Sequence, residues 1–127
     1  MILGVGLDVI EIARVRRLIE RHGEHAIRRL FTEGERAYAE THADPARHFA
    51  ARVAAKEAAF KALATHAAGR GIGWLDMEVV AGGGGRPPRL VFHRLAADVA
   101  AELEVSAAWL TITHAVDIAA ACVVLER

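Results

Sequence analysis

The sequence predicts an α+β domain in which a mostly antiparallel sheet packs against one long, enclosed, alanine-rich helix. Three observations lead to this prediction. The chain has 127 residues, enough for one well-cored domain but not two. Helical patterns dominate its first half and short strand patterns its second half. The longest helical pattern carries alanine where a surface helix would carry polar residues. Residues 1–127 are therefore expected to form a single domain.

The first half of the chain is expected to contain one strand followed by helices. Asp8 with Glu11 matches a capping box, so a helix is expected to begin there, directly after a short buried strand. Thr32 with Glu35 is a second capping box, and Gly23 is a helix-ending residue between the two. The predicted elements are a strand at residues 2–7 and helices at 8–23, 24–31, 32–42 and 44–63.

The second half is expected to contain mainly strands. Three glycines between residues 69 and 73 predict a flexible turn, and the glycine run 82–85 followed by two prolines predicts a loop. Short apolar or alternating segments between these breaks are typical of strands. The predicted elements are strands at residues 74–80, 90–92, 110–113 and 119–125 and a helix at 95–103.

The long helix combines an apolar surface with a few charged residues. Asp44 is a good N-cap residue and Pro45 suits the first helical position, so the helix should run to about Leu63. Large apolar residues form one stripe and alanines cover the opposite face, and a helix that is apolar all round is enclosed. The charged residues of its middle turns are Arg52, Lys56, Glu57 and Lys61.

Charged groups on an enclosed helix must be paired or face a polar cleft, because burying an isolated charge is costly. Three cations and one carboxylate suit a site in which cations hold phosphate oxygens and the carboxylate holds a hard divalent ion. The alternative is an ordinary i,i+4 pair between Glu57 and Lys61, with the other two cations reaching solvent along their stems.

Charge outside this helix points to a local basic face. Sixteen basic residues balance sixteen acidic ones, so no general attraction to nucleic acid or to membranes is expected. Arg14, Arg17 and Arg21 are spaced i,i+3,i+7 and share one helix face. This face could dock an acidic protein, or it could be an ordinary solvated surface.

The sequence contains no pattern that predicts export or membrane insertion. Its first apolar run is interrupted by Asp8 and has no basic segment before it, unlike a signal peptide. No apolar run approaches the roughly 20 residues of a membrane span. A cytoplasmic location is therefore expected.

An ordered set of motifs resembles the holo-acyl-carrier-protein synthase family of phosphopantetheinyl transferases. Residues 4–14 (GVGLDVIEIAR) resemble the family's G-x-D-[IV]-x-x-[IV]-x-R signature, and residues 31–35 its F-T-x-x-E segment. Residues 49–63 (FAARVAAKEAAFKAL) resemble its R-[FW]-x-x-K-E-[AS]-x-x-K core. Residues 74–79 resemble the strand after this core, and residues 85–87 its G-x-P loop. Each motif is weak alone, but the ordered set is specific.

The resemblance implies a fold, an activity and a site. The implied activity transfers 4′-phosphopantetheine from coenzyme A to a serine of an apo-acyl carrier protein in fatty acid biosynthesis, releasing adenosine 3′,5′-bisphosphate. Mg²⁺ would be held by Asp8 and Glu57, and Lys61 would neutralise a phosphate oxygen during catalysis. The implied coenzyme A contacts are Arg52, Lys56, Lys61, Thr65, Gly85, Pro87, Thr113 and His114.

The resemblance also implies partners. Carrier proteins of this pathway are acidic, so Arg14, Arg17 and Arg21 would form their docking face. Members of the family usually form homotrimers with sites at the subunit interfaces, and a homotrimer is therefore expected.

Two departures from the family pattern keep other functions open. Residues 64–66 are Ala-Thr-His where the family often has Gly-Thr-Gly, and residues 111–114 are Thr-Ile-Thr-His where it has S-x-S-H. One alternative is a non-catalytic relative that binds coenzyme A without turnover. The other is an interaction module for an acidic protein. For Asp8 a helix N-cap, and for His114 a structural role at a strand end, are the alternatives to ligand binding.

Overall fold

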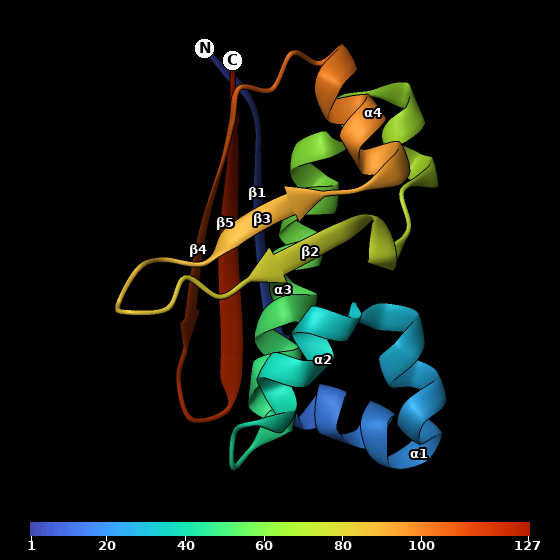
Figure 1. Cartoon of the computed structure of the whole chain (residues 1–127), viewed down its shortest axis with the longest axis vertical. Helices are drawn as coiled ribbons and strands as arrows, with labels where there is room; N and C mark the ends of the chain where they lie inside the picture. Colours follow the sequence, from blue (N-terminus) through green and yellow to red (C-terminus); the bar gives the residue numbers. More distant parts are fainter.

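The computed structural model describes all 127 residues and confirms an α+β fold with antiparallel sheets. Helix α3 (Pro45–Leu63) runs between the three-stranded sheet on one side and the other helices on the other (Figure 1). No helix combines the length and the apolar character needed to cross a membrane. The elements are β1 (Ile2–Glu11), α1 (Ile12–Leu30), α2 (Glu33–Glu40), α3 (Pro45–Leu63), η1 (Ala67–Gly71), η2 (Trp74–Asp76), β2 (Met77–Val80), β3 (Arg89–Phe92), α4 (Arg94–Glu102), β4 (Ala107–His114) and β5 (Ile118–Glu126).

The sheets are small and entirely antiparallel. The larger has the strand order β1-β5-β4, so the C-terminal strand lies between the N-terminal strand and β4. Strands β2 and β3 form a separate two-stranded sheet. The two ends of the chain meet, because the Met1 ammonium donates a hydrogen bond to the Arg127 carbonyl at 3.0 Å (Figure 1).

Helix α3 is enclosed, as its alanine content predicts. Its alanines at 50, 51, 54, 55, 58, 59 and 62 are all at most 1% exposed. Strand β1 contacts this alanine surface through Gly4 and Gly6, where a Cβ atom would clash with the backbone carbonyls of Ala62 and Ala58. The strand and the helix therefore touch backbone to backbone, and they run in opposite directions.

Sheet pairing overrides one predicted helix start. Strand β1 continues to Glu11 because its pairing with β5 extends to Glu11↔Ile118. Asp8 is therefore a strand residue, and Glu11 occupies the N-cap position of α1 without a side-chain capping bond. The prediction that a helix begins at Asp8 is wrong. A local capping pattern is worth about 1 kcal/mol, which a full ladder of strand hydrogen bonds exceeds.

The other predicted helix boundaries are largely confirmed. Gly23 adopts a non-helical conformation (φ 53°) that breaks α1, although the helix resumes to Leu30. Thr32 and Glu35 form the predicted capping box at the start of α2. Asp44 occupies the N-cap position of α3, but its carboxylate pairs with Arg16 at 2.9 Å and does not cap the helix.

The outer face of the larger sheet is unusually apolar. Along β1 the residues facing α3 alternate with Val5, Leu7 and Val9, which are 57–60% exposed. Trp109 on β4 is 61% exposed. Exposed apolar patches on a sheet commonly mark interaction surfaces.

Candidate functional site

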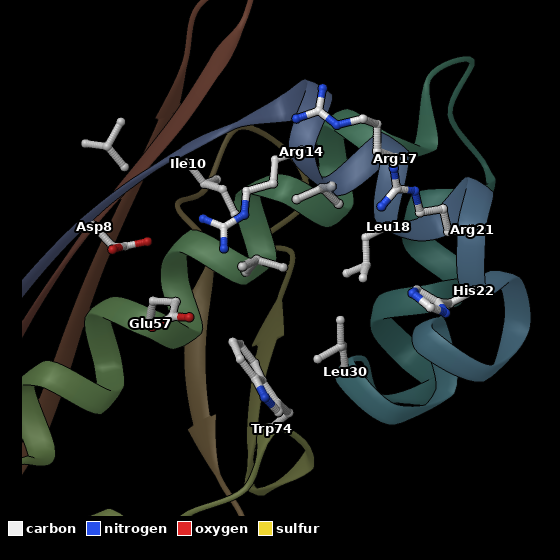
Figure 2. Close-up of a pocket in the computed structure, with 13 residues that line it drawn as sticks. Asp8, Ile10, Arg14, Arg17, Leu18, Arg21, His22, Leu30, Glu57 and Trp74 are labelled. Atoms are coloured by element: carbon white, nitrogen blue, oxygen red, sulfur yellow. The ribbon is translucent and has the colours of Figure 1, made fainter.

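A cleft of about 490 Å³ lies between the end of β1, helix α1 and helix α3. Figure 2 shows the carboxyl groups of Asp8 and Glu57 pointing into this cleft from β1 and α3. One wall is apolar and includes Leu18, Leu30 and Trp74. This first cleft therefore combines two acidic side chains with a largely apolar wall.

The close approach of β1 to α3 explains why the two carboxylates meet. Gly4 opposes Ala62 and Gly6 opposes Ala58, so Asp8, the next residue on that strand face, comes alongside Glu57. The two residues are 49 positions apart in the sequence. Glycine at both contact points makes this juxtaposition possible, because any larger residue would push the strand away from the helix.

Lys61 is joined to the same site. Its ammonium donates to the Asp8 carboxylate at 3.1 Å and to the Leu7 carbonyl at 2.8 Å, and its side chain is 55% exposed. Lys61 therefore pairs with Asp8, and the structure contains no ion pair between it and Glu57. The Glu57 carboxylate stays available to a ligand in the cleft.

The donor set of this cleft fits Mg²⁺. Magnesium is usually bound through one or two carboxylates, with substrate phosphate and water completing its coordination. Asp8 and Glu57 supply two carboxylates that open on one solvent-accessible space. No three His, Cys, Asp or Glu side chains of the chain gather into a metal site.

The predicted basic face borders the same cleft. Arg14, Arg17 and Arg21 are all exposed and all line it, together with His22 (Figure 2). Arg16, which lies between them in the sequence, is instead engaged with Asp44. The three arginines form an exposed cationic rim beside the two carboxylates.

Arg52 and His114 lie apart from these carboxylates, in a second cleft of about 370 Å³. This second cleft is formed by α2, α3, the end of β4 and the loop between β2 and β3. Its lining residues are Tyr38, His48, Ala51, Arg52, Ala81, Gly82, Gly83, Arg86, Pro88, Ile112 and His114. Of the predicted coenzyme A contacts, Gly85 and Pro87 lie in the same loop, Thr113 precedes His114, and none of these three lines the cleft.

The second cleft is cationic and partly desolvated. The guanidinium of Arg52, only 5% exposed, stacks 4.3 Å from the centre of the Tyr38 ring, and its Nε has no hydrogen-bond partner. Burial lowers the pKa of Arg52, against the opposing effect of Tyr38 and Glu35. Burial, followed by the charge of Arg47, also lowers the pKa of His114. An anion would relieve this concentration of positive charge.

His48 is the most strongly affected histidine of the second cleft. Burial and the neighbouring charges of His42, Arg52, His114 and Arg47 lower its pKa from 6.5 to about 4. In the unfolded chain His48 therefore binds a proton below about pH 6.5. In the folded chain it does so only below about pH 4. This residue should make the fold progressively less stable as the pH falls from 6.5 to 4.

Replacing His48 with phenylalanine should weaken that acid sensitivity. The melting temperature of His48→Phe should fall less than that of the wild type between pH 7 and pH 4.5, as measured by circular dichroism. His25→Phe, which changes an exposed histidine of α1, is the matched control and should keep the wild-type slope. If the melting temperatures of His48→Phe and the wild type fall equally between pH 7 and pH 4.5, His48 is not the source of the acid sensitivity.

Lys56 does not reach either cleft, which corrects the prediction that it contacts coenzyme A. Its side chain is 0% exposed and forms an ion pair with Glu35 at 2.6 Å. The remaining hydrogens of its ammonium are donated to the Leu30 and Trp74 carbonyls. An ammonium group has three donors, so none remains for a ligand.

The turn after α3 is built without the glycines that the family often has there. His66 pairs with Glu102 at 2.7 Å and so ties the turn to α4. Gly69 provides the close backbone approach, because a Cβ there would come within 2.6 Å of the Leu63 carbonyl oxygen. Thr65 is exposed and lines neither cleft.

Several lining residues were not predicted from the sequence. His48 lies four residues before Arg52 and therefore on the same helix face, so the i,i+4 spacing was an available signal. The sequence predicts that Trp74 lies in a strand, but residues 74–76 form the short helix η2, and this turns the side chain of Trp74 into the first cleft. Tyr38 carried no sequence signal, because its role depends on how α2 packs against α3.

Two carboxylates, a lysine paired with one of them and an arginine rim are the groups that proteins use to handle phosphate esters with a divalent cation. The fold and the site thus define a class of phosphate-transferring enzyme.

Comparison with known proteins identifies the family. Residues 4–122 match the model of the 4′-phosphopantetheinyl transferase superfamily. The holo-[acyl-carrier-protein] synthase of Anaeromyxobacter dehalogenans (strain 2CP-1) is 46% identical over 129 residues, which cover 99% of this chain and 97% of that protein. The chain therefore belongs to the 4′-phosphopantetheinyl transferase superfamily and, within it, to the holo-[acyl-carrier-protein] synthase family.

Solved structures agree with this assignment and confirm the predicted fold. The crystal structure of holo-[acyl-carrier-protein] synthase from Neisseria meningitidis superposes with a TM-score of 0.87 at 26% identity, covering 100% of both chains. The enzyme from Bacillus anthracis, solved in complex with coenzyme A (3′,5′-ADP), has a TM-score of 0.78 at 33% identity and covers 99% of this chain and 97% of its own.

Proposed function

We propose that this chain transfers 4′-phosphopantetheine from coenzyme A to a serine of an apo-acyl carrier protein and releases adenosine 3′,5′-bisphosphate. The observation that carries the proposal is that Asp8 and Glu57 line one cleft whose rim is basic, with Lys61 paired to Asp8. Family membership supports the same activity.

The residues of the first cleft have distinct roles in this proposal. Asp8 and Glu57 would hold Mg²⁺, which when bound supplies charge neutralisation for the pyrophosphate of coenzyme A. Lys61, half-exposed and anchored by Asp8 and the Leu7 carbonyl, would place its ammonium against a phosphate oxygen. The carboxylates can also orient a water molecule that accepts the serine proton.

The second cleft would bind the nucleotide end of coenzyme A. Arg52 supplies positive charge, and Arg52 and His114 supply hydrogen-bond donors for phosphate. The loop around Gly85 and Pro87 would lie against the nucleotide, with Thr113 as a further contact. Adenosine 3′,5′-bisphosphate carries phosphates at two positions and so can occupy more than one cationic site.

The geometry of α3 supports a homotrimer with shared sites. Arg52 and Glu57 are five residues apart and point about 140° away from each other around the helix. A second cleft from a neighbouring copy could complete the first cleft of this one. The exposed apolar face of β1 and β4, with Val5, Leu7 and Trp109, would be the surface covered in such an assembly.

A charge placed on this sheet face should separate the copies. Leu7→Glu should shift the protein from trimer to monomer in size-exclusion chromatography with light scattering, because a buried unpaired carboxylate opposes association. Val116→Glu, at a fully exposed loop position, is the matched control and should leave the mass unchanged. A trimeric Leu7→Glu would show that the face is not the contact surface.

The carrier would dock on the rim formed by Arg14, Arg17 and Arg21. These arginines are exposed and border the cleft that holds the two carboxylates, so a docked acidic carrier would bring its serine close to them. We further propose that the protein acts in the cytoplasm, in fatty acid biosynthesis.

A mass-shift assay tests the function directly. The purified protein, given Mg²⁺, coenzyme A and an apo-acyl carrier protein, should add one phosphopantetheine mass to the carrier. Binding of coenzyme A without transfer would favour a non-catalytic relative. Carrier binding whose affinity does not change when coenzyme A and Mg²⁺ are added would favour an interaction module.

A further inference from the structure

Lys56 is a buried charge that the proposed chemistry does not use. Lys56 lies on α3 directly after the buried Ala54 and Ala55, and its side chain is 0% exposed. It directly precedes the proposed metal ligand Glu57 in the chain. Its partner Glu35 is also 0% exposed and lies on α2. A fully buried lysine is rare and needs a physical reason.

The ammonium of Lys56 connects three separate elements to α3. It pairs with Glu35 on α2 at 2.6 Å and donates to the Leu30 carbonyl at the end of α1 at 2.7 Å. It also donates to the Trp74 carbonyl at the start of η2 at 2.9 Å. Four parts of the fold are thus joined at a single nitrogen atom.

Two of these acceptors belong to the wall of the first cleft. Leu30 and Trp74 both line it, and Figure 2 shows their side chains on the side opposite the Arg14 and Arg17 helix turn. The Trp74 ring is further held by Phe60, edge to face, with ring centres 5.2 Å apart. The backbone of this wall is therefore held in place by the hydrogen bonds that Lys56 donates to the Leu30 and Trp74 carbonyls.

Stability alone does not explain this arrangement. The ammonium of Lys56 is fully buried, so the protein bears the cost of removing a charge from water. An apolar pair of similar volume often serves stability equally well or better. An apolar side chain cannot, however, satisfy the carbonyls of Leu30 and Trp74, which would then take other positions.

We propose that Lys56 is a positioning residue: its ammonium holds the Leu30 and Trp74 wall at a fixed distance from Glu57, so that the cleft is shaped for the reacting groups. This proposal rests on the proposed transferase function. It assigns Lys56 no contact with coenzyme A or with the carrier. Its effect passes through the main chain of the cleft wall.

The test separates positioning from stability with three variants. Lys56→Met removes the ammonium while keeping most of the length of the side chain. Lys56→Met with Glu35→Gln also removes the unpaired buried charge, but the new amide can accept from only one of the two backbone N–H groups, of Thr32 and Val79, that bond to the Glu35 carboxylate. The double variant should therefore regain part of the lost melting temperature without regaining the two hydrogen bonds of Lys56. Val99→Ala, which removes volume from the buried core of α4, is the control for lost stability at a residue that does not line the cleft.

Kinetics and fluorescence are measured well below each variant's melting temperature. Both Lys56 variants should lower kcat by about 10- to 100-fold, the effect expected of a small misplacement of reacting groups. In a Trp109→Phe background, their Trp74 emission should shift to the red as the indole loosens. Val99→Ala should lower the melting temperature but keep the wild-type kcat and emission. Where Lys56→Met does not fold, the double variant carries the test.

Each outcome is informative. If the double variant regains kcat and Trp74 emission together with its melting temperature, Lys56 is only a stabilising residue and the proposal is overturned. Wild-type kcat and emission in Lys56→Met would also overturn it. If the wild-type chain transfers no phosphopantetheine, the proposed function fails, while the emission of Trp74 still reports whether Lys56 holds the wall.

Discussion

Replacing Asp8 with asparagine, or Glu57 with glutamine, should lower the rate of phosphopantetheine transfer by about 10³-fold. Each change keeps the shape of the side chain and removes one of the two charges that face the first cleft. A neutral amide is a much weaker ligand for a hard divalent cation than a carboxylate is. The rate is measured by mass spectrometry of the carrier, at a saturating concentration of coenzyme A.

Two controls separate this effect from a loss of folding. Asp98→Asn changes an exposed carboxylate on α4 and should keep the wild-type rate. The melting temperatures of Asp8→Asn and Glu57→Gln should stay close to that of the wild type, because both side chains face solvent-accessible space. Asp8→Asn also loses its ion pair with Lys61, which is half-exposed and therefore contributes little to stability. Near-normal rates in both variants would exclude the proposed metal site.

Gly6→Ala should destabilise the fold by about 3 kcal/mol or more, because its methyl group would clash with the backbone carbonyl of Ala58. A flexible side chain could move aside, but this carbonyl belongs to the hydrogen-bonded backbone of α3. The expected fall in melting temperature is about 10 °C or more. Thermal unfolding followed by circular dichroism measures it.

The control for this prediction is another glycine with room around it. At Gly73 the nearest atom to a new Cβ would be the Asp76 carboxylate oxygen at 3.5 Å, an ordinary contact. Gly73→Ala should therefore change the melting temperature by only a few degrees. A Gly6→Ala protein as stable as Gly73→Ala would mean that strand β1 does not touch α3 as described.

The sequence was sufficient to predict the fold class and the enclosed helix. Alanine around the whole of α3 implied burial, and the Asp44-Pro45 start and the Thr32–Glu35 capping box marked boundaries that the structure confirms. These features depend on neighbours within a few residues. The family resemblance then suggested Asp8 and Glu57, which the structure brings to one cleft.

Features that depend on tertiary pairing could not be predicted from local patterns. The Asp8–Glu11 pattern suggested a helix, but pairing with β5 kept those residues in a strand. The sequence pattern suggests that Lys56 is a ligand for phosphate, because it does not reveal the partner of Lys56, Glu35, on another helix. In the same way, the sequence suggested a Glu57–Lys61 pair, and only the approach of β1 made Asp8 the partner of Lys61.

The glycine contact between β1 and α3 has a consequence for how this enzyme could be redesigned. Where two main chains touch directly, their separation is set by van der Waals contact between backbone atoms and does not depend on the size of any side chain. Substitutions on α1, where the exposed arginines lie, should therefore not change the distance between Asp8 and Glu57. Under the proposed docking of the carrier on Arg14, Arg17 and Arg21, substitutions on this one helix should alter carrier preference while the two acidic groups keep their separation.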